Sequence, residues 1–430
     1  MDSTLFQTHA DIISARWPAL WLWLKKHDVE SIQAEWVEGL QSTLRVEGVQ
    51  LSSRHDRQAE AQLQASTLIE ADGVYVYGTA LGDLPRELLK RKSLQRLEVK
   101  IMNGALFLLV LQLLEQDDWL RDPRLELGMA GDSLEVQLPF FALPAELQLA
   151  DDTAGKMRDR LMTELHSDFV NRRFQPDNPI LVSHIEANRA LIAHDADVGA
   201  LFGSRQGQQA VVVGAGPSLQ HNLPLLRSML EQPDKRVVIC ADTAAKTLLA
   251  HGIEPHYVVI LDYRNTAEHL PVSASASMGL VYFPVLSPQT LRAWQGTRYA
   301  AYTAGAQYNR LRTDLPRAAL FSAGSVIHPA IDLAVQMGCR NITLLGADFA
   351  FPGNQTHTGW SNGALRTFIE DADRWVLDGW GQRVKSTHNF VSYLCDLERY
   401  IRRHPDVTFW NTSKQGACIE GCRYHPHFVA

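Results

Sequence analysis

Short hydrophobic runs alternate with amphipathic stretches along most of the chain. In the first third, runs such as GVYVYG (73–78) and RLEVKI (96–101) are followed by stretches whose apolar residues recur at helical spacing. After residue 209 the alternation is stronger, and it begins with AVVVGAG (210–216). Short buried strands that alternate with helices are typical of a parallel sheet covered by helices. The pattern therefore predicts an α/β protein.

The periodicity changes twice along the 430 residues. From about 149 to 202 the chain is helical and polar, which predicts a helical connector, and QPDNP (175–179) predicts a boundary near residue 175. In the last fifth, LRTFIEDADRWVLDGW (365–380) and NFVSYLCDLERYI (389–401) each carry an apolar stripe typical of a helix. We therefore predict three parts: a smaller N-terminal Rossmann-like α/β domain with the helical connector (1–175), a Rossmann-like central domain with a parallel sheet (176–360), and C-terminal helices with a closing strand (361–430).

Composition narrows the class of partner. The chain has 41 Lys and Arg against 48 Asp and Glu, a net charge of −7, which gives no global attraction for nucleic acid. The apolar run 105–114 is far shorter than the roughly 20 residues that cross a bilayer, and the first residues show no signal peptide. Five cysteines without a CxxC pair favour a reducing compartment. We expect a cytoplasmic protein with no nucleic-acid or membrane partner.

The segment VVVGAGPSL (211–219) places a glycine turn between a predicted strand and a predicted helix. Gly214 and Gly216 allow a tight turn and close approach of a ligand, and Pro217 suits a first helical turn. Ser218 adds a hydroxyl beside free backbone N–H groups at the positive end of a helix. The NAD fingerprint would need a third glycine at Leu219, so a phosphate in another setting is the expected ligand. An ordinary strand-to-helix turn is the alternative.

Acidic residues follow three other predicted strands, at the sheet edge where ligands of parallel sheets gather. Asp242, followed by Thr243, suits a ribose hydroxyl or a metal, and Asp262 ends the next strand. Both could instead cap the helix that follows. Asp348 precedes no obvious helix, which favours a functional role.

Two further segments are candidates for chemistry. His357 lies in a polar, glycine-rich loop, where an imidazole suits a general base or acid, although a solvated loop histidine is the alternative. Ser322, Gly324 and Ser325 form a small-residue turn before a predicted helix, which is a second candidate contact for an anion or nucleotide. The spacing of Cys418 and Cys422 fits no common zinc site, and we predict no metal site.

Taken in order, these motifs resemble the motility accessory factor family of bacterial flagellin glycosyltransferases. The resemblance covers roughly residues 178–421 and is carried by VVVGAGPSL, VVICADTAAKTLLAHGIEPHYVVILD, SVIHPAIDLAVQMGCRNITLLGADFAFPGNQTHT and NTSKQGACIEG. The N-terminal half is similar to the first domain of the same family through LSSRHDRQAEAQ, VYVYGTALGDL and RDPRLELGMAG. The resemblance implies transfer of a nonulosonic acid, pseudaminic or legionaminic acid, from its CMP-activated form to Ser or Thr of flagellin in the cytoplasm.

The central segment is also similar to bacterial sialyltransferases that use CMP-sialic acid. Their pattern falls on residues 214–219, 322–325, 346–349 and His357. It implies that the first loop holds the CMP phosphate or ribose, that the second turn holds the nucleotide, and that His357 deprotonates the acceptor hydroxyl. The implied nucleotide-sugar site comprises Gly214, Gly216, Pro217, Ser218, Asp242, Thr243, Asp262, Ser322, Gly324 and Ser325, with His357 and Asp348 as the catalytic residues. No metal or cofactor is implied besides the CMP-activated donor.

The chain departs from the family pattern in three places. The family's Pro-Asp is Pro255-His256, its glycine-rich first-domain loop reads GTALG (78–82), and an acidic strand end is replaced in VKIMNG (99–104). The two changes in the first domain favour a docking or dimerising role for it, and homo-oligomerisation stays open. Two alternative functions also stay open. One is an ATP- and Mg-dependent 6-hydroxymethylpterin pyrophosphokinase, which has the same central domain and would need magnesium on Asp242, Asp262 or Asp348. The other is a flagellin-binding adaptor without catalysis.

Overall fold

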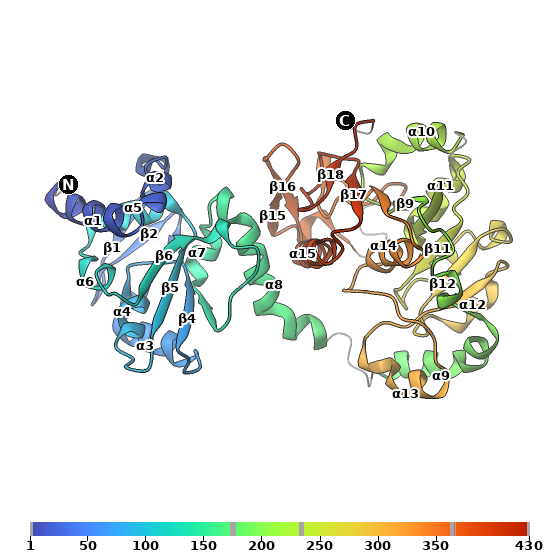
Figure 1. Cartoon of the computed structure of the whole chain (residues 1–430), viewed down its shortest axis with the longest axis horizontal. Coiled ribbons are helices and arrows are strands. Elements are labelled where there is room, and N and C mark those ends of the chain that lie inside the picture. Colours follow the sequence, from blue (N-terminus) through green and yellow to red (C-terminus); the bar gives the residue numbers. More distant parts are fainter. Residues whose placement is uncertain (1–2, 173–177, 232–235, 362–364, 366, 428–430) are drawn as a thin grey trace. The chain divides into compact units, whose positions relative to one another are not determined.

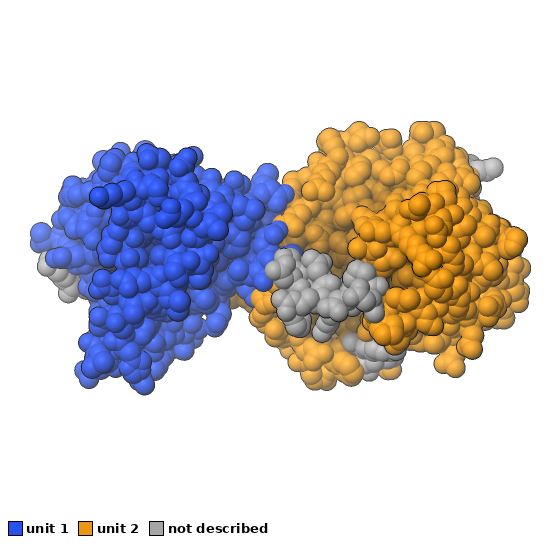
Figure 2. Space-filling view, turned by 90° about the horizontal axis from the view of Figure 1, so that it is seen from below, with its two compact units in different colours: residues 1–165 blue, residues 166–430 orange. Residues whose placement is uncertain are grey.

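Two compact units make up the chain. The computed structural model describes residues 3–172, 178–231, 236–361, 365 and 367–427. The first unit comprises residues 1–165 and the second residues 166–430 (Figure 2). The boundary predicted near residue 175 falls in 173–177, outside the described residues. The predicted third part, 361–430, belongs to the second unit and adds two strands to its sheet.

The first unit is an α/β domain with a small parallel sheet (Figure 1). Among its described residues, the parallel strands run in the order β6-β5-β4-β7: β6 (Leu125–Met129), β5 (Arg96–Ile101), β4 (Gly73–Tyr77) and β7 (Phe140–Ala142). An antiparallel sheet that the sequence did not predict comprises β1 (Ala34–Val37), β2 (Thr43–Val46) and β3 (Val49–Gln50). The helices are α1 (Ser3–Arg16), α2 (Pro18–Leu24), α3 (Arg57–Ser66), α4 (Asp83–Leu89), α5 (Gly104–Leu113), α6 (Asp117–Leu120), α7 (Pro144–Gln148) and α8 (Gly155–Arg172), the last of which continues past residue 165.

The second unit is built on a larger, wholly parallel sheet. Its described strands run in the order β18 (Arg423–Tyr424), β17 (Thr408–Asn411), β14 (Asn341–Leu345), β9 (Gln209–Val213), β10 (Val237–Ala241), β11 (Tyr257–Ile260), β12 (Gly279–Tyr282), β13 (Arg298–Ala300) and β8 (Ala196–Asp197). The helices are α9 (Pro179–His194), α10 (Leu219–Leu230), α11 (Asp242–Ala250), α12 (Pro288–Ala293), α13 (Asn309–Asp314), α14 (Ile327–Gln336) and α15 (His388–Arg402). The predicted α/β class with two Rossmann-like domains is confirmed.

Strand order reverses at β9 in the second unit. From β9 to β13 the chain adds strands on one side, and β14, β17 and β18 then extend the sheet on the other side. β9 and β14 are therefore neighbours, with Gln209 opposite Asn341 and Val213 opposite Leu345. Ligands of parallel α/β sheets bind beyond the carboxyl ends of the strands at such a reversal. The loops that follow β9 and β14 lie at this point.

The prediction that residues 365–380 form a helix is wrong. Residues Arg374–Leu377 form β15, which pairs antiparallel with β16 (Arg383–Ser386). The Asp378 carboxylate accepts hydrogen bonds from the backbone N–H groups of Trp380 and Gln382, and Gly381 takes a positive φ of 78°. This turn chemistry outweighs the helical spacing of the apolar residues. The second predicted helix is confirmed as α15.

The apolar run 105–114 and the residues that follow it form two helices, α5 and α6. Leu114 is extended (φ −134°, ψ 143°), and the N–H of Gln116 donates to His9 Nε2 at 3.0 Å. α5 is buried on most of its faces. Within the described ranges, no helix combines the length and the apolarity that crossing a bilayer requires.

Candidate functional site

The glycine loop after β9 packs directly on the loop after β14. The N–H of Gly214 donates to the Leu345 carbonyl at 2.8 Å, and the N–H of Gly216 donates to the Gly346 carbonyl at 2.9 Å. A Cβ atom at Gly214 or Gly216 would lie 2.6 or 2.7 Å from the Gly346 carbonyl oxygen. Both glycines are therefore required by the contact between the two loops, besides any role in admitting a ligand.

Asp348 connects the glycine loop to the loops that follow β14 and β17. Asp348 is 3% exposed, and its Oδ2 accepts a hydrogen bond from the Ser218 N–H at 2.8 Å. The Asp348 carbonyl accepts from the N–H of Ala417, in the loop after β17, at 2.7 Å. Burial raises the pKa of Asp348, and its contacts with Ser218 oppose that rise. Asp348 thus ties together three loops at the carboxyl edge of the sheet.

Ser218 and Pro217 lie just before α10. Ser218 occupies the N-cap position, yet its side chain makes no capping hydrogen bond, and the residue is 3% exposed. Its backbone N–H, one of the donors expected to meet a phosphate, is bonded to Asp348. A phosphate at this loop would therefore have to use other donors.

His357 lies on a loop that covers the glycine loop. Next to it, the Thr358 N–H donates to the Ala215 carbonyl at 2.8 Å, and Thr358 Oγ1 donates to the Gly216 carbonyl at 2.9 Å. The half-buried imidazole contacts the Phe390 ring edge-on, with 6.4 Å between centroids. Burial lowers the pKa of His357 to about 4, so the ring is neutral at pH 7. A neutral imidazole is the form that can accept a proton.

Asp242 and Thr243 begin α11 beside the same loop. Trp360 Nε1 donates to the Thr243 carbonyl at 2.9 Å, which anchors the end of the His357 loop. Asp242 is buried and accepts from Asn265 Nδ2 at 2.6 Å and from the Thr243 N–H at 2.9 Å. Burial raises the pKa of Asp242 to about 6, against the lowering effect of these two bonds.

Asp262 forms an ion pair of its own. Arg264 contacts both carboxylate oxygens, with Nη2 2.6 Å from Oδ2 and Nε 2.9 Å from Oδ1. Of the three acids that could have held magnesium, Asp242 and Asp348 are buried and bonded to protein donors, and Asp262 is paired with a cation. This arrangement does not fit a magnesium site, which needs carboxylate oxygens open to the ion. Within the described ranges, no group of three His, Cys, Asp or Glu side chains gathers as a metal site would require.

The turn formed by Ser322, Gly324 and Ser325 precedes α14 at the same edge. Gly324 has a positive φ of 91°, and a Cβ atom there would lie 2.7 Å from Cε1 of Tyr393 on α15. Ile327, the first residue of α14, packs near Gly214. The structure thus brings the glycine loop, Asp348, the His357 loop and this turn to one edge. The sequence did not single out three residues that make contacts at this site, because no motif marks them: Thr358, Trp360 and Asn265.

The first unit has a corresponding loop after β4, and a carboxylate fills it. Gly78 and Gly82 have positive φ values of 98° and 84°, and the backbone N–H groups of Thr79 and Ala80 both donate to Oε1 of Glu146. Glu146, from α7, is 1% exposed and also accepts from Thr79 Oγ1 at 3.3 Å. The chain's own side chain therefore occupies the backbone donors that face an anion in loops of this kind.

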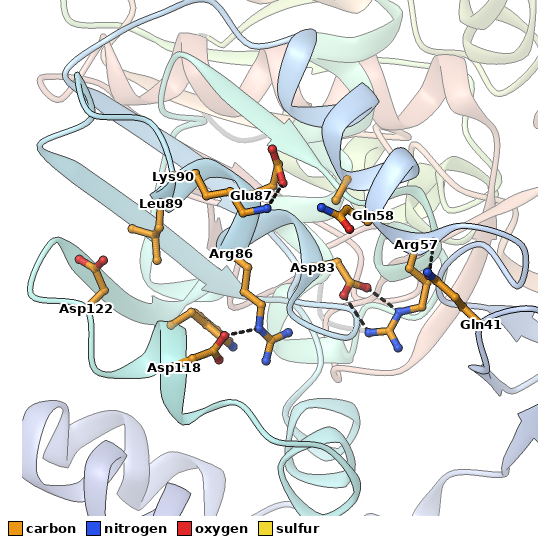
Figure 3. A pocket seen from close by; sticks show the side chains of 12 residues that line it. Gln41, Arg57, Gln58, Asp83, Arg86, Glu87, Leu89, Lys90, Asp118 and Asp122 are labelled. Atoms are coloured by element: carbon orange, nitrogen blue, oxygen red, sulfur yellow. Dashed lines mark hydrogen bonds and ion pairs between the residues drawn. The ribbon is translucent and has the colours of Figure 1, made fainter.

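The first unit also carries an open pocket of about 550 Å³ between α3, α4 and α6 (Figure 3). Arg57 pairs with Asp83 at 2.8 Å, Arg86 with Asp118 at 2.7 Å, and Lys90 with Glu87 at 2.7 Å. Charges of both signs line this pocket, and these three cations are already paired. It contains none of the residues predicted for the nucleotide-sugar site.

The comparisons bear on the second unit. Residues 183–354 match the family model described as 6-hydroxymethylpterin diphosphokinase MptE-like. The matched segment contains the glycine loop, Asp242, the Ser322 turn and Asp348, and His357 follows its last residue by three positions. The similarity to the 6-hydroxymethylpterin pyrophosphokinase domain that the sequence suggested recurs in this match.

A solved structure of a MAf glycosyltransferase from Magnetospirillum magneticum AMB-1 is similar to the chain at 16% sequence identity. The alignment covers 99% of this chain and 75% of that one, with a TM-score of 0.46. No curated protein matches the chain significantly.

Proposed function

We propose that the chain is a glycosyltransferase that moves a nonulosonic acid of the pseudaminic or legionaminic type from its CMP-activated form to Ser or Thr of flagellin in the cytoplasm. The observation that carries the proposal is the assembly at the β9/β14 edge. There, the glycine loop, the Ser322 turn and a neutral His357 lie together, while the nearby acids are engaged with the protein. Such an edge suits a donor that already has a good leaving group and needs positioning more than metal activation.

In the proposed reaction, the acceptor hydroxyl oxygen forms a bond to the anomeric carbon of the sugar. The bond from that carbon to the phosphate oxygen breaks, and CMP leaves with the electron pair. His357 takes the hydroxyl proton. A histidine with a pKa of about 4 is a weak base, but the phosphate and carboxylate of a bound donor would raise that pKa, because nearby anions favour the imidazolium. The acceptor would thus be activated once the donor is in place.

We assign the remaining site residues by position. Gly214, Gly216, Pro217 and Ser218 would border the phosphate or ribose, and Ser322, Gly324 and Ser325 would contact the nucleotide. Thr243 faces the His357 loop through its carbonyl. Asp348, expected to be catalytic, is better suited to positioning the glycine loop, and Asp242 and Asp262 to ordering the neighbouring loop, because their carboxylates are bonded to protein groups.

Binding is tested by thermal unfolding of the full chain. CMP at a hundred times its dissociation constant should stabilise the second unit by about 2.7 kcal/mol. ATP with magnesium is the comparison ligand. Stabilisation by ATP and magnesium without any effect of CMP would reverse the proposal.

Transfer is tested with flagellin and CMP-activated pseudaminic or legionaminic acid, read by the intact mass of flagellin. H357A should keep CMP binding and lose transfer. H251A is the matched control, because His251 is an exposed histidine at the end of α11. Transfer by H357A at the wild-type rate would remove His357 as the base.

One alternative is favoured by a specific observation: the matching family model is described by a pterin diphosphokinase activity. That reaction uses ATP and magnesium, for which the bonded state of Asp242, Asp262 and Asp348 is unfavourable. ATP- and magnesium-dependent product formation that a chelator abolishes would establish it. A flagellin-binding adaptor without catalysis would instead bind flagellin equally well as wild type and as H357A, with no mass change in either case.

A further inference from the structure

Two buried polar side chains of α14 face the backbone of the Ser322 turn. His328 and Asp332 lie four residues apart, hence on one face of the helix, and they are 1% and 3% exposed. His328 Nδ1 accepts a hydrogen bond from the Ala323 N–H at 3.2 Å, and Nε2 lies 3.0 Å from the Tyr393 carbonyl oxygen. A backbone N–H can only donate and a carbonyl can only accept, so the proton of the neutral ring is on Nε2.

Asp332 makes the matching contact at the start of the turn. Its Oδ2 accepts from the Phe321 N–H at 2.7 Å, and its Oδ1 accepts from Tyr400 Oη at 2.7 Å. The Phe321 ring packs against the rings of His328 and Tyr400, with centroid separations of 5.5 and 4.9 Å. The backbone at Phe321 and Ala323, in the first half of the turn, is therefore bonded through α14 to α15.

This network has a cost that packing alone would not require. Replacing buried polar groups by apolar residues of the same volume is often neutral or stabilising, and the polar groups that are kept can serve to fix one geometry. The geometry fixed here is that of residues 321–325, whose Gly324 takes a positive φ beneath Tyr393. From the sequence, His328 and Asp332 could be identified only as members of an amphipathic helix.

We propose that His328 and Asp332 are positioning residues that hold the Ser322–Ser325 turn in the conformation that receives the nucleotide of the donor. The inference rests on the proposed function, since the nucleotide is that of a CMP-activated sugar. Neither residue touches the reacting atoms. Their effect should therefore appear in nucleotide affinity and in KM for the donor, with kcat at saturating donor unchanged.

Two substitutions separate this role from general stability. In H328N the amide oxygen reaches the position of Nδ1 and can still accept from the Ala323 N–H. In H328Q the amide group reaches the position of Nε2, so the bond to the Tyr393 carbonyl is kept and the bond to the turn is lost. Both variants lose one bond of the pair. We expect H328N to bind CMP as wild type does and H328Q to bind it about tenfold more weakly, the factor that corresponds to one net hydrogen bond.

A matched control lies at the opposite end of the same sheet. His256 Nδ1 accepts from the Val238 N–H at 3.1 Å, near the amino ends of β10 and β11. H256Q removes a similar bond far from the turn, so it should lower the melting temperature and leave the dissociation constant of CMP unchanged.

The measurements are CMP titration calorimetry and donor KM and kcat on the full chain, with melting temperatures in parallel. Equal CMP affinity of H328N and H328Q, or weakening by H256Q as large as that by H328Q, would overturn the inference. If the variants do not fold, hydrogen exchange of wild type decides: CMP should slow exchange of the amides of residues 321–325, and unchanged exchange at a saturating concentration would refute the inference. Absence of CMP binding by wild type would instead refute the proposed function.

Discussion

Glu146 offers the sharpest test of the first unit, because one oxygen of this carboxylate serves two buried backbone donors. E146A leaves the N–H groups of Thr79 and Ala80 without an acceptor. A buried donor left unsatisfied costs about 2 kcal/mol, so the variant should lose about 4 kcal/mol. For a unit of this size, each kcal/mol corresponds to roughly 2–4 °C, which predicts a fall of roughly 8–16 °C in its melting temperature.

E146Q should behave differently. Both backbone N–H groups donate to Oε1, so the amide oxygen of a glutamine can accept both bonds, and E146Q should melt close to wild type near pH 4. E87A is a second control on α4, where the exposed pair with Lys90 is worth less than about 1 kcal/mol. The assay is calorimetry of the full chain, which separates the transitions of the two units when they differ.

The same carboxyl predicts a pH dependence. Burial raises the pKa of Glu146 in the folded chain, so the folded state holds its proton more tightly than the unfolded state does. Its stabilising contribution is complete below the unfolded pKa of about 4.3 and is lost as pH rises through the folded pKa. Wild type should therefore lose stability relative to E146Q across that window. An E146A variant that melts with wild type, or a wild-type to E146Q difference that does not change with pH, would refute the reasoning.

Two further predictions concern the second unit. G216A should destabilise it by about 2 kcal/mol, because the new Cβ meets the Gly346 carbonyl and the Asp348 carboxylate at 2.7 and 2.5 Å, and CMP protection should fall with it; an unchanged melting temperature would contradict this packing. Asp242 has a pKa raised to about 6, so its contribution is present below the unfolded value of about 3.9 and is lost as pH rises to about 6; D242N should show a flatter melting temperature between pH 4 and 7 than wild type, and parallel curves would count against the raised pKa.

The order of strands and helices in the second unit could be predicted because its strands are buried on both faces and appear as continuous apolar runs. The same argument failed for β1 to β3, because these strands are only two to four residues long and β1 is largely exposed. It also failed at residues 374–386, where the Asp378 turn decides the structure locally.

The sequence predicted at which edge of the sheet the candidate residues lie, but it did not predict the contacts between them. Strand ends locate the glycine loop, Asp242, Asp262 and Asp348 at one edge, because the carboxyl ends of parallel strands share an edge. The bond from Ser218 to Asp348 and the bonds from α14 to the turn depend on side-chain packing between segments distant in sequence. No local sequence pattern indicates that the carboxylates of Asp348 and Asp332 accept hydrogen bonds from the protein's own backbone.

The pairing of β9 with β14 also has a consequence for the order of folding. Ser218 and Asp348 are 130 residues apart, and β10 to β13 lie between them in the chain. Closing so long a loop costs conformational entropy, and this cost is offset only when β9 and β14 have paired. Such non-local contacts slow folding. During synthesis, the glycine loop emerges from the ribosome well before the segment that completes it. A nascent chain that stops short of Asp348 therefore lacks the candidate site, even when its earlier strands have already formed.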